Sequence, residues 1–94
     1  PTTVYIVDDD PAMRESLTYL LEAEGFRVRS FKDASEFLGL SEIERPSCLL
    51  LDLRLGDTDG LVLREEWGRR GITLPTIMIS GQSEIPDVVR AMKQ

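Results

Sequence analysis

Three short apolar runs, separated by segments with helical periodicity, constrain the fold of this chain more than any other feature. The runs are TVYIV at Thr3–Val7, CLLL at Cys48–Leu51 and TIMI at Thr76–Ile79. Runs of this length that are apolar at every position are typical of strands buried on both faces of a parallel sheet. A fourth run, Phe26–Phe31, alternates between apolar and polar residues and indicates a half-exposed strand at or near the edge.

The segment after the first strand carries the signals of a helix. Asp10 and Pro11 begin it, because an aspartate caps free amides and a proline at the first helical position loses no needed donor. Gly25 is a natural end for this helix. Its apolar residues repeat at helical spacing and predict one buried stripe, made of Met13, Leu17, Leu20 and Leu21.

Three more helices are expected, over residues 33–40, 61–70 and 83–93. The side chains expected to face the core are Phe37 and Leu38 in the first of these, and Leu63 and Trp67 in the second. Strand and helix then alternate four times along the chain. This alternation predicts an α/β fold, in which a doubly wound parallel sheet carries helices on both faces.

Composition narrows the class of protein. The chain of 94 residues suits one domain, and its net charge of −6 disfavours direct binding to the phosphate backbone of nucleic acids. A single cysteine, Cys48, excludes an internal disulfide, and its place in an apolar run predicts that it is buried. No apolar run approaches the ~18 residues of a membrane span, and the cytoplasm is the expected compartment.

Acidic side chains follow two of the apolar strands, at the point where each strand ends. Asp8 and Asp9 follow the first strand and Asp52 follows the third; we call these three the acidic trio. Functional groups gather at the carboxyl ends of the strands in such sheets. If the two strands are neighbours, roughly 5 Å apart, the trio converges. Two carboxylates ~4 Å apart repel by about 4 kcal/mol at an effective dielectric of 20. Three such groups therefore need either a bound cation such as Mg²⁺ or raised pKa values.

Ser80 and three further aspartates are the other polar residues to be considered near the trio. Ser80 ends the strand that follows Asp52, where its hydroxyl is placed to contact a group held by that carboxylate. A purely structural interpretation, as helix cap or turn former, accounts for Asp10, Asp57 and Asp59. It does not account for the acidic trio as a set.

Three motifs, in order, resemble the receiver domain of two-component response regulators. They are VDDD before an amphipathic helix, then LLLDLRLGDTDG, then IMISGQ. The resemblance spans the whole chain, and the segment SEIPDVVRAMK is most similar to the FixJ-like branch of the LuxR family. It implies a three-layer, flavodoxin-like (CheY-like) fold with strand order 2-1-3-4. It also implies a fifth strand and helix after Gln94, so residues 1–94 are expected to be a receiver domain incomplete at its C-terminus and without an output domain.

The resemblance implies a role for each matching residue. Asp52 matches the phosphoacceptor, and its two partners in the trio match the acidic pair that holds Mg²⁺ with it. Ser80 matches the hydroxyl that binds a phosphoryl oxygen and moves on phosphorylation. Arg54 matches the position whose main-chain carbonyl also reaches the metal, and together with Gln82 it matches positions that tune autodephosphorylation.

The implied function is phosphoacceptor signalling. The chain would take a phosphoryl group from a phosphohistidine on a sensor histidine kinase and relay the signal to a transcriptional, DNA-binding output domain in the parent protein. It would act as a phosphoacceptor with self-phosphorylation and autodephosphorylation chemistry, and not as an enzyme.

Two departures from the family pattern carry expectations of their own. Gly56 stands where the family usually has proline, and neither Lys32 nor Lys93 matches the lysine that contacts the phosphoryl group. Without a fifth strand, the fourth would be an exposed apolar edge that invites pairing. We therefore expect either disorder beyond Gln94 or a homodimer or strand-edge contact through residues 76–80.

Three other interpretations are weighed against this one. Asp8 and Asp10 have the Asp-x-Asp spacing of haloacid dehalogenase phosphatases, but Ala12 stands where those enzymes need threonine. A calcium-binding EF-hand frame would put Leu55, which cannot ligate, at its first position. The third is a receiver that signals by protein contacts without stable phosphorylation, against which the intact acidic trio argues.

Overall fold

Four parallel strands form one sheet in the order β2-β1-β3-β4. The computed structural model describes residues 2–40, 42–52, 60–71 and 74–79, together with Pro86 and Arg90. The elements are β1 (Thr3–Val7), α1 (Pro11–Ala23), β2 (Arg27–Phe31), α2 (Ala34–Leu38), β3 (Ser47–Asp52), α3 (Gly60–Arg69) and β4 (Thr76–Ile79). This order of strands and helices confirms the predicted doubly wound α/β fold.

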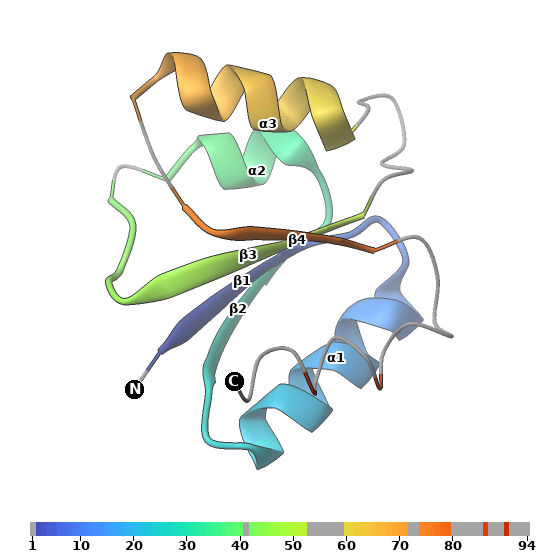
Figure 1. The fold of residues 1–94 in the computed structure, drawn as a ribbon. Coiled ribbons are helices and arrows are strands. Elements are labelled where there is room, and N and C mark those ends of the chain that lie inside the picture. The colour runs from blue at the N-terminus through green and yellow to red at the C-terminus, as the bar shows by residue number, and fades with distance from the viewer. Residues whose placement is uncertain are drawn as a thin grey trace.

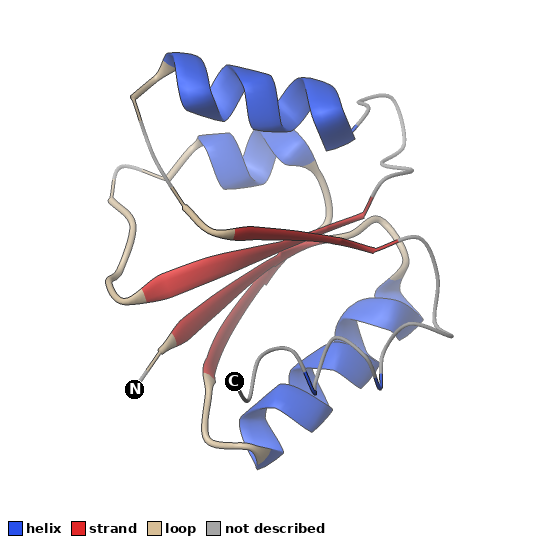
Figure 2. Ribbon diagram, viewed as in Figure 1, coloured by secondary structure: helices blue, strands red, loops and turns tan. Residues whose placement is uncertain are grey.

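Helices cover both faces of the sheet, so the molecule has three layers (Figure 1). α1 lies on one face, and α2 and α3 lie together on the other (Figures 1 and 2). Successive side chains of β1 and β3 point to opposite faces of the sheet, so these strands contribute residues to two separate cores. The core under α1 consists of Val4, Ile6, Met13, Leu17, Leu21, Cys48, Leu50 and Ile79. The core under α2 and α3 consists of Tyr5, Val7, Ala34, Phe37, Leu49, Leu51 and Trp67.

The structure confirms the predicted start of α1 and corrects its buried stripe. Asp10 is the N-cap, and its side chain accepts a hydrogen bond from Ala12 N at 3.0 Å. The prediction that Leu20 is buried is wrong, because this residue is 38% exposed. Each residue turns about 100° around a helix, so Leu20 lies well to the side of the line through its buried neighbours.

The other helices are close to the predicted ranges. α2 is shorter than expected, with Asp33 as N-cap and Leu38 only half-buried. Trp67 on α3 is buried as predicted, whereas the side chain of Leu63 lies outside the described residues. Of the predicted helix over residues 83–93, only Pro86 and Arg90 are described, and both are helical. None of the helices in the described part of the chain has the length and hydropathy needed to cross a bilayer.

Burial also separates the central strands from the outer ones. β1 is buried at every position, and β3 is buried up to its last residue. β2 is mostly exposed, as its alternating sequence predicted, while β4 is half-buried over three of its four residues. Cys48 lies inside β3 and is buried as predicted, and burial raises the pKa of its thiol to about 11.

Candidate functional site

The ends of β1 and β3 bring the acidic trio together at the carboxyl edge of the sheet. The register of the two strands pairs Val7 with Leu51, so the aspartates that follow these residues lie at the same level. One carboxylate oxygen from each of Asp8, Asp9 and Asp52 lies within 4.8 Å of the others. The three differ in burial, because Asp8 is buried, Asp52 is half-buried and Asp9 is exposed.

Asp8 is held at both its side chain and its main chain. Its Oδ1 accepts a hydrogen bond from Asp10 N at 2.9 Å, and its own N–H donates to Phe31 O at 3.1 Å. Its carbonyl oxygen accepts from Arg14 Nη1 at 2.6 Å. With these contacts, the carboxylate of Asp8 lies beside that of Asp52 at the end of β3.

Burial and neighbouring charge make Asp8 a weak acid. Burial is the largest cause and raises the pKa of Asp8 to about 6, while the hydrogen bond from Asp10 N opposes the rise. The charges of Asp52 and Asp9 raise the pKa of this carboxyl further. The trio thus concentrates more negative charge than the site accommodates without a proton or a cation.

Asp10 has a structural role next to the site. Its carboxylate caps α1, and it is not a member of the group of converging carboxylates among the described residues. The Asp-x-Asp spacing that it forms with Asp8 therefore does not correspond to a pair of carboxylates facing one another.

Arg14 is a site residue that sequence reasoning missed. Its guanidinium reaches back one turn from α1 to the carbonyl of Asp8. The sequence feature that could have identified it is an arginine in the first turn of the predicted helix. The helix dipole disfavours positive charge there, so a nearby hydrogen-bond acceptor is expected.

Several predicted residues cannot be placed beside the trio. They lie outside the described residues: Arg54, Gly56, Asp57, Asp59, Ser80 and Gln82. Asp52 pairs with Ile79 in the β3–β4 register, and Ser80 is the next residue in the sequence.

The donor set of the trio fits a hard divalent cation. Three carboxylates on one edge offer oxygen ligands only, which suits Mg²⁺ better than metals that prefer nitrogen or sulfur. The raised pKa of Asp8 is the electrostatic strain that a cation at this position would relieve.

Comparison with known proteins agrees with the fold. Residues 4–94 match the family model of the response regulator receiver domain. The chain belongs to this family. It is 43% identical over 90 residues to nodulation protein W of Bradyrhizobium diazoefficiens, and 38% identical over 91 residues to the transcriptional regulatory protein FixJ of Rhizobium meliloti. Its relatives thus include the FixJ-like transcriptional regulators, as the motifs predicted.

The matches cover nearly all of this chain but only part of each relative. They take in 96% and 97% of the chain, and 40% and 45% of nodulation protein W and FixJ. The chain therefore spans less than half the length of these two relatives.

Solved structures share the fold. The response regulator StyR superposes with a TM-score of 0.79 at 40% identity, over 98% of this chain and 46% of that one. FixJ-N superposes with a TM-score of 0.79 at 38% identity, over 99% of this chain and 74% of that one. These likenesses confirm the predicted CheY-like receiver fold.

Proposed function

We propose that the chain accepts a phosphoryl group on Asp52 from a sensor histidine kinase and relays the signal to a transcriptional output domain. The observation that carries the proposal is the convergence of the acidic trio at the carboxyl edge of the sheet. Membership in the receiver family supports it. The expected compartment is the cytoplasm, where a kinase and a transcriptional output would both be within reach.

In the proposed reaction, a carboxylate oxygen of Asp52 attacks the phosphorus of a phosphohistidine. The phosphorus–nitrogen bond breaks, the imidazole nitrogen keeps the electron pair, and an aspartyl phosphate forms. Asp52 is half-buried at the end of a central strand, which holds its carboxylate in place and leaves one side open to a donor. The chain is a phosphoacceptor in this scheme and not an enzyme acting on a separate substrate.

Asp8 and Asp9 would hold Mg²⁺ together with Asp52 and the main-chain carbonyl of Arg54. When bound, Mg²⁺ supplies positive charge that offsets the charge on the phosphoryl oxygens. Asp8 contributes a carboxylate fixed by the Asp10 N–H, and exposed Asp9 contributes one that adjusts.

Ser80 and Gln82 complete the proposed site from the segment after β4. The pairing of Asp52 with Ile79 supports this role for Ser80, because it follows Ile79 directly. Its hydroxyl would donate to a phosphoryl oxygen and report phosphorylation by moving. Gln82 and Arg54 would tune hydrolysis of the aspartyl phosphate. A homodimer or strand-edge contact through residues 76–80 stays a prediction.

The test is direct phosphorylation. The chain is incubated with Mg²⁺ and acetyl phosphate, and intact mass spectrometry is expected to show the added mass of one phosphoryl group. The Asp52→Asn variant should gain none, while Asp33→Asn, which changes a carboxyl at the cap of α2, should gain as much as the parent chain.

Beryllofluoride, which mimics a bound phosphoryl group, gives a second measurement. Binding to the parent chain and not to Asp52→Asn supports the proposal. If a version extended along its natural sequence past Gln94 takes up neither reagent, the proposal is wrong and the chain is a receiver that signals by protein contacts alone.

A further inference from the structure

β2 is the outer strand on its side of the described sheet, and two of its residues turn their main-chain groups away from β1. The N–H of Arg27 and the C=O of Phe31 bond to residues that flank β1, at 3.0 Å and 3.1 Å. Bonding alternates along a strand of a parallel pair, so Val28 and Ser30 direct their N–H and C=O groups away from β1. Within the described ranges, no hydrogen bond to either residue's outward groups is present.

The two faces of β2 differ in charge beside this open edge. Arg27 and Arg29 are exposed on the face toward α2, where the side chain of Phe31 packs. Val28 packs into the core under α1 on the other face, and Ser30 is exposed there. A strand added to β2 would therefore meet Arg27 and Arg29 on the face toward α2.

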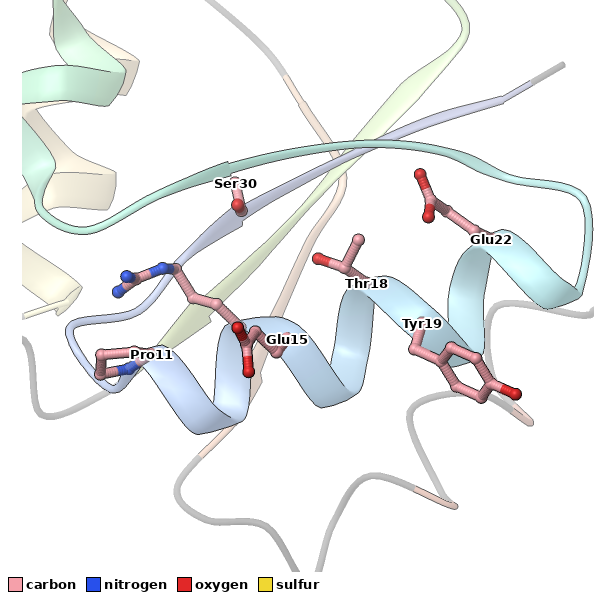
Figure 3. Close-up of a pocket in the computed structure, with 7 residues that line it drawn as sticks. Pro11, Glu15, Thr18, Tyr19, Glu22 and Ser30 are labelled. Atoms are coloured by element: carbon pink, nitrogen blue, oxygen red, sulfur yellow. The ribbon is translucent and has the colours of Figure 1, made fainter.

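On the α1 face, the edge of β2 borders a groove of about 380 Å³ (Figure 3). Thr18 and Glu22 project from α1 toward β2, and Ser30 lies across from them. Tyr19 is 76% exposed, which leaves an aromatic ring uncovered at the rim. The full lining is Pro11, Arg14, Glu15, Thr18, Tyr19, Glu22 and Ser30.

Two carboxylates and one cation line this groove, so the lining is acidic on balance. Glu15 and Glu22 lie on α1 two turns apart, and both are exposed. The cation, Arg14, keeps its charge, and its guanidinium is directed to the carbonyl of Asp8, to which it donates a hydrogen bond at 2.6 Å. Basic side chains therefore fit the α1 face of the edge. Acidic side chains fit the arginine face, where Arg27 also forms an exposed ion pair with Glu44 at 3.9 Å.

We propose that the edge of β2 binds an extended segment of a partner protein by strand addition. Main-chain bonds to Val28 and Ser30 would supply the pairing, and side chains of the segment would alternate between the two faces. Basic residues at every second position would lie near Glu15 and Glu22, and acidic residues between them would lie near Arg27 and Arg29. The partner is thus a strand of alternating charge.

A second copy of this chain does not meet that pattern. Antiparallel pairing of two β2 edges places the arginines of one copy beside those of the other, and like charges in directly opposed positions destabilise a sheet. The proposal is also independent of phosphoryl chemistry at Asp52, so either proposal can fail without the other.

The test uses the 94-residue chain, labelled with ¹⁵N, and a capped peptide of sequence Glu-Lys-Val-Lys-Glu-Lys-Val. On addition of the peptide, the amide protons of Val28 and Ser30 are expected to become protected from exchange with solvent. The same peptide with N-methyl groups on its pairing amides keeps its charges and should lose this binding. Binding to Asp52→Asn should be unchanged.

Matched variants distinguish the contribution of main-chain pairing to peptide binding from the contribution of side-chain charge. Ser30→Pro removes an outward donor that β1 does not use, and an edge strand tolerates it, so binding should be lost while the fold remains. Ser30→Ala keeps the donor and should bind as the parent does. Glu15→Gln with Glu22→Gln should weaken binding about fivefold, as expected for the loss of exposed ion pairs.

Three results would overturn the proposal. One is equal binding of the N-methylated peptide, which would show attraction of charge without strand pairing. Another is full binding to Ser30→Pro in a variant whose melting temperature matches that of the parent. The third is dimerisation of the chain through β2, seen by sedimentation and broken by Ser30→Pro, which would assign this edge to a second copy.

Discussion

Asp8 holds its proton more tightly in the folded chain than in the unfolded one. Its side chain is buried and faces two other carboxylates, and its pKa rises from the ordinary 3.8 to about 6. A folded-state pKa above the unfolded value means that the folded chain binds more protons between these two pH values. Ionisation of Asp8 therefore works against folding in this window.

The first prediction concerns the pH dependence of stability without divalent cations. The contribution of Asp8 to the free energy of unfolding is fully present below about pH 4 and is lost as the pH rises through about 6. Urea unfolding measured across this range, in the presence of a chelator, should show the fall.

Asp8→Asn is the matched control for this prediction, because it keeps the size of the side chain and an acceptor for the Asp10 N–H. The difference in stability between parent and variant should shift in favour of the variant as the pH rises. A difference that stays constant from pH 4 to 7 would contradict the assignment.

Among the elements, α1 connects the acidic trio to the core. Its N-cap, Asp10, satisfies one free amide and places the following turn, from which Arg14 reaches the carbonyl of Asp8. Asp10→Ala should lower the free energy of unfolding by about 1 kcal/mol, the usual cost of a lost cap. Asp10→Asn, which retains a capping oxygen, should cost less, and denaturant unfolding measures both.

A phosphorylation assay distinguishes this capping role of Asp10 from a catalytic role. Both variants of Asp10 should still take up a phosphoryl group from acetyl phosphate, because the carboxylate of Asp10 bonds to Ala12 N. Loss of uptake in Asp10→Asn, at unchanged stability, would favour the Asp-x-Asp interpretation instead.

Strands and helix starts were predictable from the sequence because each depends on local signals. β1 is buried at every position and mostly apolar, and α1 has a capping aspartate followed by proline. The convergence of the trio followed from the same strands, given that β1 and β3 are neighbours. The exposure of Leu20 was not predictable in this way, since it depends on how α1 is rotated over the sheet.

The whole molecule should respond to a cation at the acidic trio. A ligand that binds only the folded state stabilises it, by about 2.7 kcal/mol when its concentration is one hundred times the dissociation constant. Titration with Mg²⁺ should therefore raise the melting temperature. The effect should be larger at pH 7.5 than at pH 5.5, because Asp8 is more fully ionised at the higher pH.

Asp9→Asn and Asp33→Asn are a matched pair for this measurement. Asp9 is exposed and belongs to the trio, whereas Asp33 caps α2. The gain in melting temperature should shrink in the first variant and remain in the second. Equal gains in both would place the cation elsewhere on the molecule.

The acidic trio lies at the carboxyl ends of the two central strands, so the stability of these strands limits how far its geometry changes. β1 and β3 are paired on both sides and buried under helices on both faces, so their amides open to solvent only when much of the domain unfolds. The outer strands β2 and β4 each have a free side among the described strands. The backbone that leads into Asp8 and Asp52 is thus expected to exchange more slowly than the outer strands, and rearrangements of β2 or β4 should leave these two carboxylates next to each other.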